Sequence, residues 1–212
     1  RDHCVTGVQT CALPISASSE TRRLADGDKA RSADGEDRPA LVVGPTDWPR
    51  FRGPALDSQV TWKTGVTDWT TAPPRELWRL PVGPAWSSFA CVAGRLYTQE
   101  QQGEHEVVCC LDAATGRPIW QSQLDCRFSD VVAGPGPRST PTFDDGRLFT
   151  LGARAMLIAH DAATGAELWR RDLMQELDAQ LPVWGFSGSP IVVGDTVIVY
   201  AGGKDDHGLD RK

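Results

Sequence analysis

Three features are scarce in this sequence of 212 residues. No apolar run approaches the roughly 20 residues that a membrane helix needs, so we expect no transmembrane segment. The chain has no excess of positive charge, because 22 basic and 28 acidic residues leave a net charge of −6. We therefore expect no nucleic-acid partner. Tyrosine occurs only twice, whereas tryptophan occurs 8 times, glycine 21 times and proline 15 times. This combination favours an all-β protein with many tight turns.

Residues 1–15 resemble a translated sequencing adapter. Converted back to codons, they match the two constant stretches of such an adapter, which lie on either side of its short variable index. A signal peptide is the alternative, but residues 5–15 carry polar side chains where such a peptide has an apolar core. Without this segment the chain keeps four cysteines, too few for a disulfide-stapled domain.

Residues 16–46 are predicted to form a disordered linker. Nearly half of the side chains between residues 16 and 38 are charged, none is aromatic, and Leu24 is the only large aliphatic one. Such a composition cannot bury enough apolar surface to offset the entropy lost on ordering. Its positive and negative charges nearly cancel, unlike those of a nucleic-acid-binding tail. We expect ordered structure from Asp47 onward.

Two eleven-residue segments repeat at a period of about 50 residues, the range of propeller blades. Residues 110–120 (CLDAATGRPIW) recur as residues 159–169 (AHDAATGAELW), and Glu76-Leu77-Trp78-Arg79 is a shorter copy of their last part. An upstream Gly-Arg-Leu-aromatic-Thr motif occurs at residues 94–98 and 146–150, and more loosely at 194–199. We expect two complete units at about 86–120 and 138–169, and a truncated third unit at 186–212.

Each unit contains four short β-prone runs separated by turns. In the second unit these runs are residues 139–143, 147–151, 156–160 and 167–171. They predict four-stranded antiparallel blades, and residues 47–212 are therefore predicted to be an incomplete, all-β propeller. Because neighbouring blades cover both faces of each sheet, the strands should be apolar on both sides, as residues 107–111 are.

The repeated Asp-Ala-Ala-Thr-Gly segment has the residues of a tight turn. The aspartate can cap the turn with its side chain, and the glycine can adopt the left-handed conformation that closes it. The tryptophan that follows then falls on the outermost strand of the blade. These motif residues are Asp112, Gly116 and Trp120 in the first unit and Asp161, Gly165 and Trp169 in the second.

The pattern Ala-x-Asp-x-x-x-Gly-x-x-x-Trp, complete at residues 159–169, resembles the tryptophan-docking repeat of quinoprotein-like β-propellers. Residues 110–120 follow it with cysteine in place of alanine, and residues 47–54 (DWPRFRGP) are similar to the start of exported bacterial members. That family includes pyrroloquinoline-quinone alcohol dehydrogenases and a non-catalytic lipoprotein of outer-membrane barrel assembly. The resemblance implies a propeller fold and a periplasmic or cell-surface location.

For a dehydrogenase, the resemblance further implies a quinone at the propeller mouth, a calcium ion held by carboxylate and amide oxygens, a carboxylate base, and often a ring of two bonded adjacent cysteines. Cys109 and Cys110 are adjacent, but the repeat alignment favours buried strand residues. The sequence contains no asparagine to serve as a calcium ligand. We therefore assign no catalytic residue and no metal ligand, and expect a binding or assembly module. The alternative is the N-terminal part of a dehydrogenase that uses pyrroloquinoline quinone with calcium.

Three segments at matching positions, residues 86–88, 138–140 and 186–188, come just before the innermost strands. In a propeller such segments line the mouth of the central channel. Their aromatic, guanidinium and hydroxyl groups suit a planar, anionic or sugar-like ligand, although packing between adjacent blades would also explain them. The candidate residues for an unknown small molecule or protein at the mouth are Trp86, Ser87, Arg138, Ser139, Trp184 and Phe186.

Overall fold

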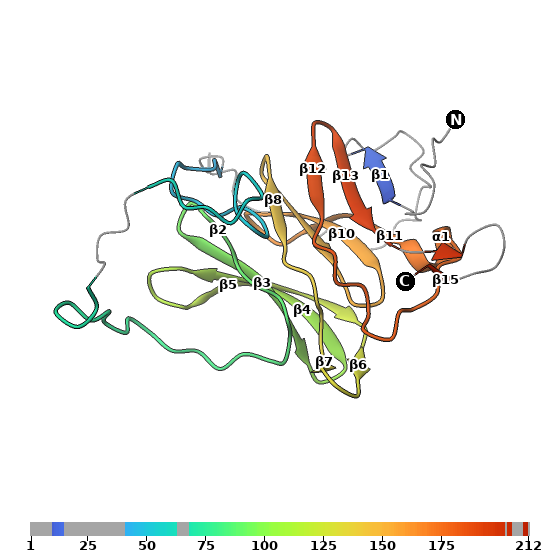
Figure 1. Ribbon diagram of the computed structural model, residues 1–212, viewed down its shortest axis with the longest axis horizontal. Coiled ribbons are helices and arrows are strands. Elements are labelled where there is room, and N and C mark those ends of the chain that lie inside the picture. Colours follow the sequence, from blue (N-terminus) through green and yellow to red (C-terminus); the bar gives the residue numbers. More distant parts are fainter. Residues whose placement is uncertain (1–9, 15–40, 63–67, 202, 205–209, 212) are drawn as a thin grey trace, which may run out of the picture.

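The computed structural model describes residues 10–14, 41–62, 68–201, 203–204 and 210–211. Most of the adapter-like segment and most of the predicted linker lie outside the described residues. The ordered part is built from antiparallel strands and one short helix, as Figure 1 shows.

The first sheet is a four-stranded antiparallel meander in which each strand pairs with the next along the chain. Its strands are β2 (Ala90–Val92), β3 (Arg95–Gln102), β4 (His105–Asp112) and β5 (Pro118–Asp125). The register of β4 with β5 shifts between Cys110 and Leu111, where the chain enters the first Asp-Ala-Ala-Thr-Gly turn.

The second sheet repeats this arrangement. Its strands are β8 (Thr142–Asp144), β9 (Arg147–Leu151), β10 (Met156–Asp161) and β11 (Glu167–Asp172). The register of β10 with β11 shifts between Ala159 and His160, the place equivalent to the shift in the first sheet. A short helix, α1 (Leu173–Glu176), follows, and the Asp172 side chain caps it. The predicted four-stranded antiparallel blades are therefore confirmed.

The third sheet contains only two strands of the third unit, β12 (Ile191–Val193) and β13 (Thr196–Tyr200). The strand β1 (Thr10–Pro14) pairs antiparallel with the free edge of β13, with Thr10 opposite Tyr200 and Pro14 opposite Thr196. In the first two units that edge is occupied by the third strand of the same unit. A segment distant in sequence thus covers an edge that would otherwise expose unpaired backbone groups.

Two small ribbons complete the list of strands. One is β6 (Ser129–Asp130) with β7 (Gly134–Pro135), in the connection between the first and second sheets. The other is β14 (Gly203–Lys204) with β15 (Asp210–Arg211).

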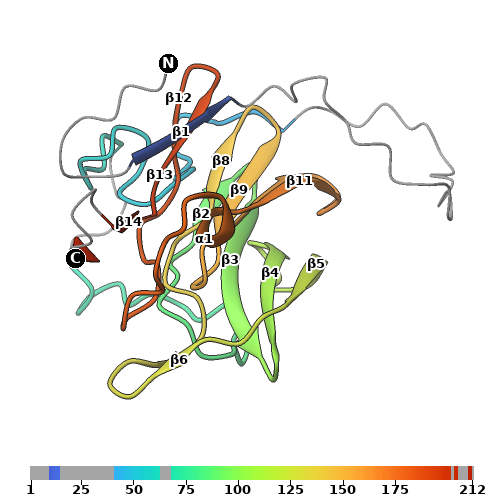
Figure 2. The same cartoon turned by 90° about the vertical axis from the view of Figure 1, so that its right-hand side faces the viewer.

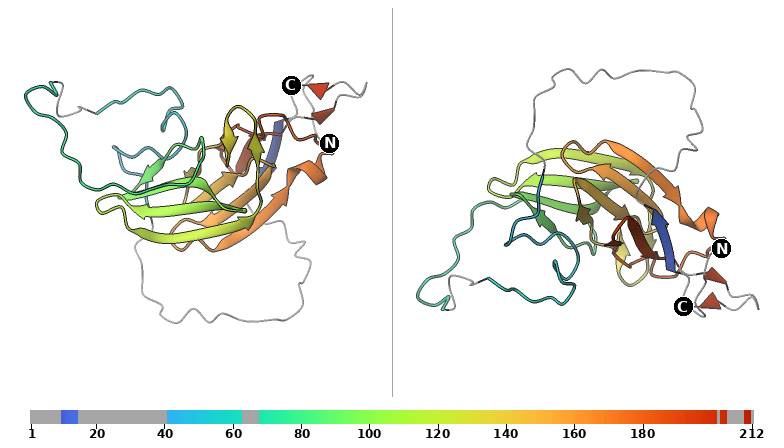
Figure 3. Two further views of the ribbon diagram at one scale, coloured as in Figure 1. Left: turned by 90° about the horizontal axis from the view of Figure 1, so that it is seen from below. Right: turned by 90° about the horizontal axis from the view of Figure 1, so that it is seen from above.

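The three sheets follow one another with their faces packed together (Figures 2 and 3). Tyr97, Phe143 and Leu148 are fully buried in the apolar layer between the first and second sheets. Phe149 and Val197 lie in the corresponding layer between the second and third sheets. Within the described residues the sheets do not close into a ring, so the fold is a partial β-propeller, as predicted.

β3 and β4 are both buried along most of their length, but only β4, apart from Glu106, is apolar as predicted. Every residue of β4 from Glu106 to Leu111 is buried, because neighbouring segments cover both faces of the sheet. In β3, however, the buried stretch Thr98–Gln101 is polar. The side chains of Thr98, Gln99 and Glu100 reach partners in adjoining segments or strands. The side-chain amide of Gln101 donates to the backbone carbonyls of Gly103 and Cys126. The interior around β3 is therefore hydrogen-bonded and not uniformly apolar.

Candidate functional site

The two repeated turns have the geometry that their residues predict. Asp112 Oδ1 accepts hydrogen bonds from the amide and the hydroxyl of Thr115, at 2.8 and 2.7 Å, and Asp161 binds its own threonine in the same way. These bonds hold the pKa of Asp112 below its usual value, with the Thr115 hydroxyl as the largest cause. Gly116 and Gly165 adopt φ values of +71° and +78°, which glycine takes without strain.

Two tryptophans of the repeat, Trp78 and Trp120, contact the turn of the following unit. Trp120 Nε1 donates to the carbonyl of Ala162 at 3.1 Å, and its ring lies over Gly165 so closely that a Cβ there would be 2.5 Å from Trp120 Cε3. Trp78 makes the equivalent contacts with Ala113, at 3.0 Å, and with Gly116. Trp169 is half-buried against Phe149. The indoles of Trp78 and Trp120 therefore join neighbouring units.

Hydroxyl groups join the first two predicted mouth segments to each other, and the second to Ser189, which directly follows the third. The amide of Ser88 donates to Thr140 Oγ1 at 3.0 Å, and the amide of Thr140 donates to Ser189 Oγ at 2.9 Å. The first strand of the second sheet starts later than predicted because the amide of Thr140 is used in this lateral bond and Pro141 has no amide hydrogen.

Arg138 is buried, and its donors are used within the protein. Its guanidinium donates to Asp130 Oδ2 at 2.5 Å, to the carbonyl of Gly134 at 2.6 Å and to the carbonyl of Trp184 at 3.4 Å. It also stacks over the ring of Phe128. Arg138 therefore fastens the β6–β7 ribbon to the segment before the third sheet and does not present its charge to solvent.

Asp130 is the partner of Arg138 that the sequence did not reveal. Besides the ion pair, it accepts hydrogen bonds from the amides of Ala133 and Val132, at 2.6 and 2.8 Å. These contacts, with the Ala133 amide as the largest cause, hold the pKa of Asp130 below its usual value. The only local signal is an aspartate placed two and three residues before the amides it caps, a pattern common to many turns.

Three of the other predicted residues also hold the segments in place. Ser139 Oγ donates to the carbonyl of Leu151 at 2.6 Å, and Ser87 Oγ accepts from the amide of Gln99 at 3.3 Å. Phe186 is buried, and its amide donates to the carbonyl of Ala153 at 2.9 Å. None of the three presents its side chain fully to solvent.

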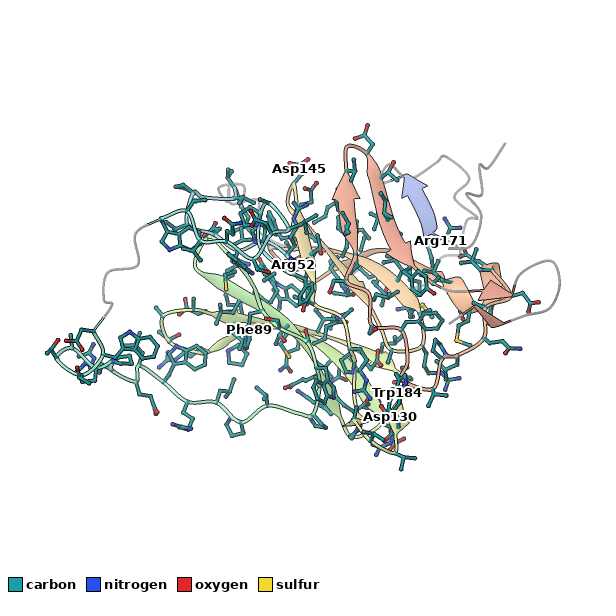
Figure 4. All side chains as sticks on the ribbon, viewed as in Figure 1. Arg52, Phe89, Asp130, Asp145, Arg171 and Trp184 are labelled. Atoms are coloured by element: carbon teal, nitrogen blue, oxygen red, sulfur yellow. The ribbon has the colours of Figure 1, made fainter. Side chains whose placement is uncertain are left out.

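The two remaining candidates are exposed tryptophans. Trp86 is 65% exposed and Trp184 is 53% exposed. Trp86 Nε1 donates to the carbonyl of Ala133 at the tip of the β6–β7 ribbon. Figure 4 shows Trp184 and Asp130 at the same end of the molecule. We define the mouth patch as the exposed apolar side chains on these connected segments: Trp86, Val131, Val132, Val183 and Trp184.

The mouth residues do not fit a quinone held with calcium. The guanidinium of Arg138 and the carboxylate of Asp130 are paired with each other, so neither is free to hold an anionic cofactor or a cation. Cys109 and Cys110 are free thiols whose side chains lie in different apolar clusters on the two faces of β4. Among the described residues, no three His, Cys, Asp or Glu side chains come together as a metal site.

Repeated four-stranded sheets joined by indole-on-glycine contacts define the chain as part of a β-propeller. A family profile described as outer membrane protein assembly factor BamB matches residues 63–212, more than half of the chain. The chain belongs to this family of PQQ-like repeats. No curated protein matches its sequence. Within the described residues, no helix is both long enough and apolar enough to cross a membrane.

Solved structures give the same fold. A quinohemoprotein alcohol dehydrogenase from Comamonas testosteroni is 21% identical with a TM-score of 0.54, over 74% of this chain and 23% of that chain. A europium-containing methanol dehydrogenase is 18% identical with a TM-score of 0.55, over 74% of this chain and 27% of that chain. The chain thus spans about a quarter of the length of either enzyme. At these identities the likeness shows the fold alone.

Proposed function

We propose that the chain is part of an exported β-propeller that serves as a binding and assembly module, and that the mouth patch contacts a protein partner. The observation that supports this proposal most is the gathering of five large apolar side chains on solvent-exposed segments fastened by a buried ion pair. Contiguous exposed apolar surface marks interaction sites, and tryptophan is enriched among the residues that dominate binding energy.

Hydrogen bonds hold the segments of the mouth patch in place, which favours binding. The Trp86 indole is held by the Ala133 carbonyl, the tip of the β6–β7 ribbon by the Asp130 side chain, and the backbone at Trp184 by Arg138. Rigid side chains lose little conformational entropy when a partner docks. Because the guanidinium of Arg138 is already paired with Asp130, an apolar protein surface suits the patch better than an anionic small molecule.

Site-specific cross-linking tests the proposed contact. A photo-reactive residue placed at Trp86 or Trp184 should yield a defined cross-linked partner in intact cells, and one at Leu168, an exposed residue on the outermost strand β11, should not. The double variant Trp86→Ala/Trp184→Ala should lose co-purification of that partner, whereas Leu168→Ala should keep it. Equal cross-linking at all three positions, or an unaffected double variant, would refute a contact at the mouth.

The second candidate is the N-terminal part of a pyrroloquinoline-quinone-dependent dehydrogenase. The observation in its favour is the fold likeness to the two dehydrogenases, whose TM-scores are 0.54 and 0.55. The quinone and its metal would then have to be held by residues other than the six predicted mouth residues. Adding quinone and calcium to the protein and following visible absorbance and alcohol oxidation tests this candidate, and the assembly proposal expects neither a bound chromophore nor turnover.

A further inference from the structure

Ala153 links all three units of the fold. It lies in the turn between β9 and β10 of the second unit, and its amide donates to Glu106 Oε1 of the first unit at 3.1 Å. Its carbonyl accepts from the amide of Phe186, two residues after Trp184 of the mouth patch, at 2.9 Å. A single residue thus connects the carboxyl group of Glu106 to the mouth.

The carboxyl group of Glu106 is held in a tight, buried contact between the first two sheets. Glu106 is only 5% exposed. A Cβ on Gly152 would lie 2.4 Å from Glu106 Oε2, so the backbone of the turn approaches the carboxyl group as closely as glycine allows. Among the described residues, Glu106 forms no ion pair within 4 Å.

Four titratable or charged groups face Glu106 from the elements around it. Cys126, in the connection after β5, contacts the carboxyl group, and burial raises the pKa of this thiol to about 12, so it stays protonated. Arg138, before β8, and Arg154, in the β9–β10 turn, attract the charged form at longer range. His160 of β10 lines the same small space between the sheets. Burial lowers the pKa of His160 to about 4, so it is neutral above that pH.

Burial without an ion pair disfavours the charged form of a carboxyl group. Desolvation accordingly raises the pKa of Glu106 from 4.5 to about 7, against the smaller effects of the Ala153 amide and the two arginines. The folded protein therefore binds more protons than the unfolded chain between these two values. The stability that Glu106 contributes is complete below about pH 4.5 and is lost as the pH rises through about 7.

We propose that Glu106 is a proton-controlled latch between the first two units, which holds the β9–β10 turn and the mouth segment in place when protonated and loosens both when ionised. The charged carboxylate draws water into the contact with Ala153, and the hydrogen bond from Phe186 to the same residue transmits the loosening to Trp184. The role of the latch in partner binding rests on the function proposed above for the mouth patch.

Hydrogen exchange of the free chain tests the latch without a partner. After correction for intrinsic exchange rates, the amides of Ala153 and Phe186 should open about tenfold more often at pH 8 than at pH 6. This ratio follows if opening exposes Glu106 to solvent, because its pKa then falls from about 7 in the closed state to 4.5 in the open state. Glu106→Gln, a neutral side chain of the same shape, should reduce this ratio to about one. Glu104→Gln, at an exposed neighbouring position, should leave it at about ten.

A second measurement keeps the test independent of the folding of the Gln variant. With carbon-13-labelled glutamate, one carboxyl resonance of the unaltered chain should titrate near pH 7. An unaltered chain whose glutamates all titrate below about pH 5, or a pH ratio that persists in Glu106→Gln, would overturn the latch. Both readouts concern the free chain, so failed cross-linking at Trp86 and Trp184 would refute the partner contact and not the latch.

Discussion

The indole of Trp120 lies against Gly165 of the following sheet and donates its hydrogen bond to the turn that contains this glycine. The pair joins two elements 45 positions apart in the numbering, from an outermost strand to the turn of the next unit. Trp78 and Gly116 form the same contact one unit earlier. Neighbouring units are thus joined at their outer edge by a tryptophan ring packed on a glycine, in addition to the apolar layers between the faces of the sheets.

Trp120→Ala should destabilise the chain by about 2 to 4 kcal/mol, toward the lower end of the range for large aromatic residues because this ring is only half-buried. The variant removes the bond to Ala162 and the ring contacts with Tyr97 and His160. Urea unfolding followed by circular dichroism measures the effect. Trp86→Ala, which removes an exposed indole, should change the stability by less than about 0.5 kcal/mol, and equal losses in both variants would contradict the contact.

Gly165→Ala should be more destabilising than Gly146→Ala. Both glycines have positive φ values, +78° and +73°, so alanine costs about 1 kcal/mol of backbone strain at either position. A new Cβ at Gly165 also collides with Trp120, whereas one at Gly146 meets nothing within 4 Å. The difference in unfolding free energy therefore isolates the collision. Equal values for the two variants would show that the indole does not occupy this place.

The stability of Glu106→Gln should rise by on the order of 3 kcal/mol between pH 4 and pH 6.5, because burial lowers the pKa of His160 from 6.5 to about 4. The unfolded chain binds more protons than the folded one in this window, so stability falls as the pH falls. In the unaltered chain Glu106 has the opposite dependence between pH 4.5 and 7 and offsets much of the effect. Urea midpoints across the window measure both.

The double variant Glu106→Gln/His160→Phe is the control for that experiment. It removes the buried imidazole while keeping an aromatic ring beside Trp120. Its stability should be nearly flat over the same window. A slope that survives in the double variant would assign the pH dependence to other groups.

Cys109 and Cys110 should resist alkylation in the folded chain at neutral pH. Burial raises the pKa of their thiols to about 12 and about 11, so almost no thiolate is present to react. Mass spectrometry of peptides after brief iodoacetamide treatment, with and without urea, measures the protection. Leu168→Cys, at an exposed position, should react within the same time. Fast labelling of the buried pair, or a disulfide between the two residues, would contradict their placement on opposite faces of β4.

The sequence predicts the turns and the sheets better than the mouth. The Asp-Ala-Ala-Thr-Gly segments determine their own conformation, because the aspartate, the threonine and the glycine that shape each turn are all local. Arg138 is different, since its role depends on Asp130 and Trp184, which reach it only through the folded connections between sheets. An arginine beside two hydroxyl residues suggested a ligand-facing charge, and no local pattern distinguishes that arrangement from a buried ion pair.

The polar stretch of β3 was also not predictable from the sequence, because its partners come close only in the folded chain. Alternation and composition give the face on which a side chain lies but not what lies opposite it. Gln99 reaches Ser139 of the next unit, and Glu100 reaches the amide of Gly83 in the segment before the first sheet. Those partners are brought into place only by the stacking of successive units, which a single-unit pattern does not contain.

The hydroxyl links from Ser88 to Thr140 and from Thr140 to Ser189 span 52 and 49 residues, one unit each. Each link joins only immediate neighbours, so it helps to fix the rotation from one sheet to the next without reference to the rest of the molecule. A succession of such units turns through a similar increment at each step. A contact between one hydroxyl and one amide, repeated from unit to unit, therefore contributes to the curvature of the array.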